Sequence, residues 1–104
     1  MMEERVCSIH DLGSGQSRRF VLGTLDIALV RIGDDFYAIA NTCSHQKVSL
    51  AEGDVHADSL EIECSKHGSC FSLETGKPSS FPATKAVPVY DIRIDGDNVM
   101  VVLS

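Results

Sequence analysis

Two short pairs of cysteine and histidine, Cys43-Ser-His45 and Cys64-Ser-Lys-His67, carry the clearest chemistry in this sequence. Eighteen residues lie between His45 and Cys64, so the pairs belong to two separate loops. Each pair supplies one thiolate and one imidazole. Together they suit either a tetrahedral zinc ion or a [2Fe–2S] cluster in which two imidazoles replace two thiolates on one iron. The choice between these sites largely decides what the protein does.

Short β-strands must position the two loops, because apolar and polar residues alternate along much of the sequence. The stretch Leu60-Glu61-Ile62-Glu63-Cys64 is typical of a half-buried strand that would deliver Cys64 to a loop. No window shows helical periodicity, so we expect an all-β sandwich or small barrel of short antiparallel strands. The predicted strands cover residues 18–22, 25–32, 36–40, 60–64, 69–73, 85–94 and 99–103.

Turn residues separate these predicted strands. Gly33-Asp34-Asp35 and Asp95-Gly96-Asp97-Asn98 are typical of tight hairpins. Residues 46–59, which connect the two pairs, permit only a loop with one short strand, and we expect Leu50 and Val55 to cover the metal site.

Length and composition indicate one ordinary globular domain, spanning residues 1–104, for which a bound metal would add useful stability. The formal charge of −6 argues against a nucleic-acid partner, since phosphate binding needs clustered Lys and Arg. The apolar runs are too short to span a membrane, and no secretory signal is visible, which favours the cytoplasm. Four cysteines in such a chain indicate metal or redox chemistry more than a disulfide framework.

The two pairs and their surroundings resemble the C-x-H…C-x-x-H-G loops of Rieske proteins. The resemblance extends through Phe71, Thr75-Gly76, Pro82-Ala83 and the closing 89–96 segment, and it covers essentially the whole chain. It implies a [2Fe–2S] cluster, a Rieske-like fold and a cluster-binding subdomain formed by loops at about 43–48 and 64–71. It also implies that Cys43 and Cys64 hold the inner iron, while His45 and His67 hold the outer iron at the loop tips.

Residues around the second pair refine this expectation. Respiratory Rieske proteins bridge the two loops with a disulfide, but the corresponding positions are Val48 and Lys66 here. Ser69 matches a serine that hydrogen-bonds the cluster sulfurs, whereas Phe71 replaces a tyrosine that does the same. The resemblance therefore implies a reduction potential near the low end of the Rieske range. Gly68 either aims its N–H at a bridging sulfide or is an ordinary turn glycine.

The remaining cysteines and histidines are expected to have no role in the cluster. Cys7 lies in a predicted N-terminal strand and reads as a small buried residue. Cys70 lies three residues after His67, but strand alternation places it on the opposite face from Phe71. His10 and His56 have no nearby cysteine in a suitable register, and we expect them on the surface.

We interpret the chain as a Rieske-type ferredoxin, an electron carrier with no catalytic residues of its own. The resemblance implies a monomer that passes electrons from a flavin-dependent reductase to a ring-hydroxylating dioxygenase or other oxygenase. Two alternatives within electron transfer are iron–sulfur cluster assembly and the small subunit of an assimilatory nitrite reductase. A zinc-stabilised interaction module is the alternative from another class, and it would be colourless.

Overall fold

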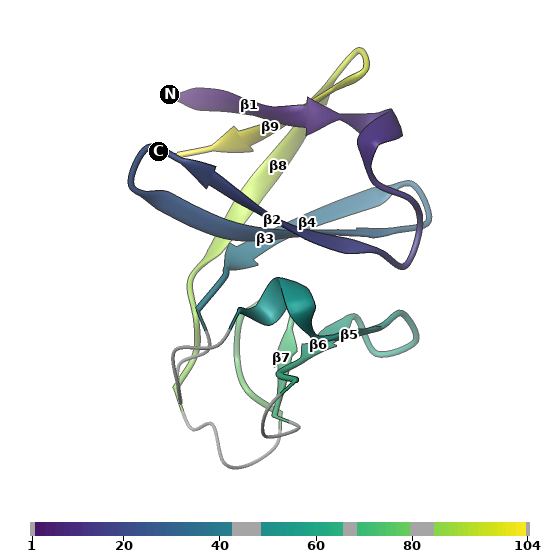
Figure 1. Cartoon of the computed structure of the whole chain (residues 1–104), viewed down its shortest axis with the longest axis vertical. Helices are drawn as coiled ribbons and strands as arrows, with labels where there is room; N and C mark the ends of the chain where they lie inside the picture. Colours follow the sequence, from purple (N-terminus) through teal and green to yellow (C-terminus); the bar gives the residue numbers. More distant parts are fainter. Residues whose placement is uncertain (1, 43–48, 66–68, 80–84, 104) are drawn as a thin grey trace.

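The computed structural model describes residues 2–42, 49–65, 69–79 and 85–103, and these residues are mostly β-strand. Figure 1 shows a larger sheet at one end and a small sheet at the other. The strands are β1 (Glu3–Ser8), β2 (Ser17–Leu22), β3 (Leu25–Ile32), β4 (Asp35–Ala40), β5 (Asp54–His56), β6 (Glu61–Glu63), β7 (Cys70–Ser72), β8 (Val89–Asp95) and β9 (Asn98–Val102). Two 3₁₀ turns join them, η1 (Ile9–Asp11) and η2 (Leu50–Glu52). No helix among the described residues is long and apolar enough to cross a membrane.

Six antiparallel strands form a nearly closed, barrel-like sheet in the order β1-β9-β8-β4-β3-β2. Strand β8 joins the β1-β9 side to the β4-β3-β2 side, because it pairs with both β9 and β4. The second sheet has the order β5-β6-β7 and is also antiparallel. The all-β prediction is confirmed, and the small sheet provides the subdomain that carries the loop ends.

Strand β3 is buried on both faces and belongs to two hydrophobic cores. Its Ile27 and Leu29 point into the barrel, where they join Cys7, Leu12, Ala38 and Val99. Its Ala28 and Val30 face the small sheet, where they join Ile39, Leu50, Ile62, Cys64, Phe71, Leu73 and Val87. We call this second cluster the junction core. Burial on both faces explains why the strand reads as a continuous apolar run.

The observed strands match the predicted ones to within a few residues, with one larger difference. Residues 85–88 were expected to begin a strand, but β8 starts at Val89. Pro88 has no N–H to donate to a ladder, and its carbonyl accepts from the Ala40 N–H instead (2.8 Å). The short turns η1 and η2 were not predicted, because a turn of three residues is too short to show a helical pattern of apolar residues.

Asn41 ties together the two ends of the first loop. It lies directly after β4 and is 3% exposed, and its side-chain Oδ1 accepts from Ser49 Oγ (3.0 Å) and from the Ala51 N–H (3.1 Å). Its backbone carbonyl accepts from the Leu50 N–H (2.6 Å), and Thr42 forms a β-bridge with Ser49. One buried side chain therefore fixes where the loop leaves the large sheet and where it returns.

Gly76 allows a close approach between the turn after β7 and the segment before β8. Its φ is +76°, and the Val87 N–H donates to its carbonyl (2.9 Å). A Cβ at this position would overlap the Val87 carbonyl oxygen. Glycine is required here for two separate reasons, the left-handed backbone and the absence of space.

We predict that Gly76→Ala destabilises the fold by at least about 2 kcal/mol more than Gly15→Ala does. Gly15 is the matched control, because its φ is +81° but nothing lies within 4 Å of a Cβ built there. Its substitution should cost about 1 kcal/mol from backbone strain alone. Urea unfolding of both variants measures the difference. Equal losses of unfolding free energy in the two variants would show that the Val87 carbonyl can move away from the added methyl group without cost.

We predict that Asn41→Leu lowers the free energy of unfolding by about 1–3 kcal/mol, because the Ala51 N–H loses its acceptor. Asn41→Asp, which keeps an acceptor oxygen, should lose less. Asn98→Ala is the surface control, since its Oδ1 accepts from Arg5 Nε (2.7 Å) at an exposed site. Urea unfolding monitored by circular dichroism gives all three values. A loss for Asn98→Ala as large as that for Asn41→Leu would contradict a special role for Asn41.

Candidate metal centre

Of the four predicted ligands, Cys64 lies within the part of the chain that the structure describes. Cys43, His45 and His67 lie outside it, as do Val48, Lys66 and Gly68. The roles expected of these residues therefore stay predictions, and the described ends of the loops supply the geometry.

Cys64 lies at the end of β6 and is completely buried in the junction core. Its backbone N–H donates to the Ser69 carbonyl (2.7 Å), which joins the two described ends of the second loop. A buried thiolate needs a positive partner, since an isolated buried charge is costly. The position therefore suits a metal ligand held from the protein side.

Residues after the second loop alternate as the sequence predicted. Ser69 and Phe71 are completely buried, whereas Cys70 between them is half-buried on the other face of β7. Phe71 packs in the junction core with Cys64. The placement of Cys70 on the opposite face from Phe71 is confirmed.

The junction core brings the two loops to one end of the molecule. Leu50 follows the first loop, Cys64 begins the second, and both are completely buried in this core. Val87, which follows residues 80–84, belongs to the same cluster. Three connections that are distant in sequence thus start or finish against one set of apolar side chains, at the end occupied by the small sheet (Figure 1).

The described part of the segment that connects the two pairs, residues 49–59, contains η2 followed by β5. Leu50 is buried and Val55 packs at the edge of the junction core, so both support the small sheet from within. Ser17 of β2 donates from its Oγ to the Ala51 carbonyl (2.6 Å), which ties η2 to the large sheet. The predicted single short strand is confirmed, while a role for Leu50 and Val55 in covering a metal stays a prediction.

The other cysteine and histidines expected to have no role in the cluster lie where the sequence predicted. Cys7 is 4% exposed inside the barrel, and burial raises the pKa of its thiol. His10 and His56 are exposed. His56, however, lies beside Glu63 and Cys70, a grouping that no local sequence motif indicates because the three residues come from three strands.

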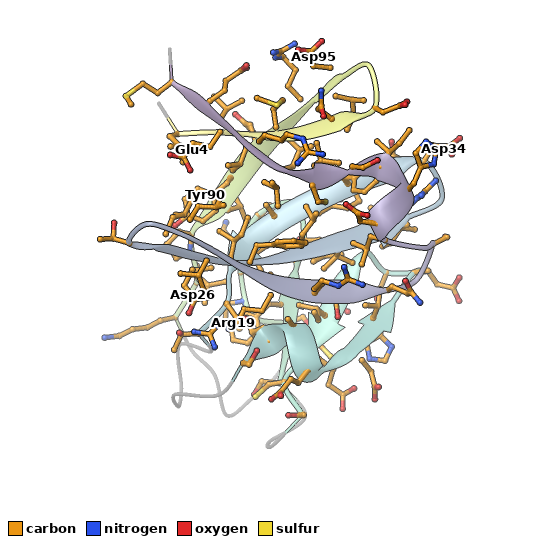
Figure 2. All side chains as sticks on the ribbon, turned by 45° about the horizontal axis from the view of Figure 1, so that its top comes forward. Glu4, Arg19, Asp26, Asp34, Tyr90 and Asp95 are labelled. Atoms are coloured by element: carbon orange, nitrogen blue, oxygen red, sulfur yellow. The ribbon has the colours of Figure 1, made fainter. Side chains whose placement is uncertain are left out.

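Charge is distributed unevenly between the two ends of the molecule. All four lysines of the chain, at positions 47, 66, 77 and 85, fall in or beside the three loop segments. Residues 36–51, 64–73 and 75–90 contain no Asp or Glu, although the chain has fifteen acidic residues. Figure 2 shows Glu4, Asp34 and Asp95 toward the opposite end. The loop segments therefore carry lysines and no acidic residue, although the small sheet beside them is acidic, with five Asp and Glu residues in 48–65.

The chemistry of the donor set fits a mixed cluster. Two thiolates balance the charge of an oxidised [2Fe–2S] unit, and two neutral imidazoles complete the coordination of the second iron without adding charge. The buried Cys64, whose N–H is bonded to the Ser69 carbonyl, is placed where it would provide one such thiolate.

Comparison with known proteins gives one consistent result. Residues 3–91 match the Rieske [2Fe-2S] domain family. Ferredoxin CarAc of Metapseudomonas resinovorans is 38% identical over 98 residues, which cover 93% of this chain and 90% of that protein. The ferredoxin of carbazole 1,9a-dioxygenase from Nocardioides aromaticivorans IC177 superposes with a TM-score of 0.95 at 36% identity, with full coverage of both chains.

A second solved structure holds a ferredoxin together with its oxygenase. It is the complex of reduced oxygenase and oxidized ferredoxin in carbazole 1,9a-dioxygenase, with a TM-score of 0.86 and 37% identity over 95% of this chain and 91% of that one. Relatives of this kind are electron carriers rather than catalytic enzymes. The buried cysteine, the loops that share one core and the match over residues 3–91 agree: the chain belongs to the Rieske [2Fe–2S] domain family, among the ferredoxins of dioxygenase systems.

Proposed function

We propose that this protein carries single electrons from a flavin-dependent reductase to the terminal oxygenase of a ring-hydroxylating dioxygenase system. The observation that carries the proposal is the buried Cys64 at the mouth of the closed second loop, in a chain whose relatives are dioxygenase ferredoxins. The whole chain, residues 1–104, acts as one Rieske domain and works as a monomer in the cytoplasm.

Four side chains would hold the [2Fe–2S] cluster in this proposal. Cys43 and Cys64 bind one iron from the protein side, and His45 and His67 bind the other from the loop tips. When bound, the cluster accepts and returns one electron at a time. The protein anchors it through the junction core, because Cys64 and Leu50 are both held there.

The lysine-bearing loop end is the docking surface in this proposal. Lys77 and Lys85 are exposed at this end, and no acidic residue lies within the loop segments. A local positive field attracts an acidic partner surface and speeds encounter more than it tightens the complex. A ferredoxin captured with its oxygenase among the structural relatives supports contact with such a partner.

We predict that the protein purified without oxygen is red-brown and that its reduced form gives the EPR signal of a mixed His/Cys cluster. Cys43→Ser and Cys64→Ser should each remove the visible absorbance and the iron, because each deletes one thiolate ligand. Cys7→Ser is the matched control and should keep both, since Cys7 lies in the barrel core.

Iron analysis and absorption spectra of the three variants decide this point. A colourless wild-type protein that contains one zinc ion would contradict the cluster and support the zinc-stabilised module. An unchanged cluster in Cys43→Ser would show that the ligand set is wrong.

We predict that the double variant Lys77→Gln/Lys85→Gln transfers its electron more slowly to an oxygenase. Loss of two positive charges at the docking end should lower the second-order rate constant by about threefold to tenfold at low salt, and less at high salt. Stopped-flow mixing of the reduced protein with the terminal oxygenase of carbazole 1,9a-dioxygenase from N. aromaticivorans IC177 measures the rate.

Arg93→Gln controls for net charge. Arg93 pairs with Glu3 (2.6 Å) and lies near Asp95, which Figure 2 places far from the small sheet. Its removal should change the rate by less than about twofold, because exposed charges separated by more than a Debye length are largely screened. A lysine variant as fast as wild type at every salt concentration would place the docking surface elsewhere.

A further inference from the structure

The outer face of the small sheet carries polar side chains in a fixed register. Asp54, Glu63 and Cys70 lie directly opposite one another across β5, β6 and β7, and His56, Glu61 and Ser72 form the next row. Residues directly opposite in antiparallel strands point to the same face. The alternate residues Val55, Ile62 and Phe71 point inward, so the junction core holds the polar face in place from behind.

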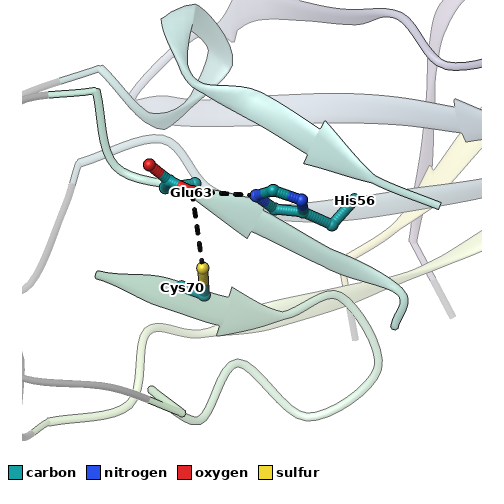
Figure 3. A group of neighbouring side chains, drawn as sticks. All are labelled: His56, Glu63 and Cys70. Atoms are coloured by element: carbon teal, nitrogen blue, oxygen red, sulfur yellow. Dashed lines mark hydrogen bonds and ion pairs between the residues drawn. The ribbon is translucent and has the colours of Figure 1, made fainter. Parts of the chain in front are cut away.

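Three of these outer side chains converge on one point (Figure 3). His56 Nε2 lies 2.9 Å from Glu63 Oε1, and the same oxygen lies 3.9 Å from Cys70 Sγ. All three ligand atoms lie within 4.8 Å of one another, and they come from three adjacent strands. His56 and Glu63 are 43% and 35% exposed at their side chains, so solvent reaches the group.

The separations suit a tetrahedral zinc ion. Bonds of about 2.0–2.1 Å to nitrogen, 2.0–2.2 Å to oxygen and 2.3 Å to sulfur place the ligand atoms about 3.4–3.6 Å apart. The His56–Glu63 distance would have to open by about 0.5 Å and the Glu63–Cys70 distance to close by about 0.3 Å. The third separation, between His56 Nε2 and Cys70 Sγ, is at most 4.8 Å and would have to be about 3.6 Å. Side-chain rotations would supply these changes, while the strand pairing holds the backbone in place.

The local charge also favours a cation. Residues 48–65 contain no Lys or Arg but five acidic residues, and Asp54 and Glu61 share the face with the three candidate ligands. One nitrogen, one oxygen and one sulfur form a donor set typical of Zn²⁺ rather than of Ca²⁺ or Mg²⁺.

We propose that His56, Glu63 and Cys70 form a Zn²⁺ site on the outer face of the small sheet, with the fourth position open to water. The site is separate from the cluster ligands, since its side chains point away from the junction core. On binding, Cys70 releases its thiol proton to solvent, and His56 presents the Nε2 lone pair with its proton on Nδ1.

Zinc at this site would join the three strands of the small sheet, of which β6 and β7 carry the second loop. Glu63 immediately precedes Cys64, and Cys70 immediately follows Ser69, whose carbonyl closes the loop. A bond from each strand to one ion resists their separation. A ligand that binds only the folded state raises the free energy of unfolding by RT ln(1 + [L]/Kd).

Titration of the cluster-loaded, thiol-reduced protein with Zn²⁺ against a chromogenic chelator tests the proposal. We expect one equivalent of zinc to bind with the visible cluster spectrum unchanged, and the alkylation of Cys70 by N-ethylmaleimide to slow by about tenfold or more. Cys7 is buried in the barrel, so it should contribute little to the labelling. Mass spectrometry of the labelled peptides identifies the protected thiol.

His56→Ala, Glu63→Gln and Cys70→Ser should each weaken zinc binding by about tenfold or more. His10→Ala is the matched control, because His10 is exposed beside Asp97 (3.8 Å) and belongs to no group of three candidate ligands among the described residues, so it should bind zinc as wild type does. Binding that survives both His56→Ala and Glu63→Gln would overturn the three-ligand site. Binding accompanied by loss of the cluster spectrum would overturn it as well, since zinc would then occupy the cluster ligands. Both results leave the electron-carrier function to be judged by its own tests.

Discussion

Apolar packing between the small sheet and β3 is the constraint on which the rest of this structure depends. Strands of three residues, such as β5, β6 and β7, cannot hold a sheet together in water by their own hydrogen bonds. Ile62 and Phe71 supply the missing stabilisation by burying completely against Ala28, Val30 and Ile39 of the larger sheet. This packing also fixes where the two ligand-bearing loops are attached, because Leu50 and Cys64 belong to the same cluster. A single core therefore serves both the fold and the metal centre.

The two ends of the molecule have different tasks and different chemistry. The barrel end carries its own apolar core and an acidic surface on which Arg93 pairs with Glu3. The loop segments and the residues beside them carry all four lysines, whereas residues 48–65, which include two strands of the small sheet, carry five acidic residues. Buried polar groups are used sparingly, and Asn41 is placed where one side chain can hold both ends of a loop. The two ends therefore meet at the junction core, whose residues serve both stability and the metal centre.

Much of this organisation could be predicted from the sequence, because strand alternation and hairpin turns are local signals. The β3-β4 and β8-β9 hairpins, the burial of Cys7 and the opposite faces of Cys70 and Phe71 all follow from residues near one another in the chain. The late start of β8, at Val89 instead of residue 85, also has a local cause, because Pro88 has no N–H to donate to a ladder. One feature was beyond such reasoning. His56 reaches Glu63 and Cys70 through the register of three strands, and register depends on which faces are buried.

The two-faced burial of β3 has a consequence for how its alignment is encoded. In a strand with one solvent-exposed face, a shift of the pairing by one residue would move its apolar side chains into solvent, which is unfavourable. Residues 27–30 are all apolar, so polarity cannot distinguish the two alignments of this stretch. Size can do so, since the larger Ile27 and Leu29 fill the barrel while the smaller Ala28 and Val30 leave room for the small sheet. A slip would press large side chains against Phe71 and open voids in the barrel at once. Side-chain volume, rather than polarity, therefore determines the alignment of this strand.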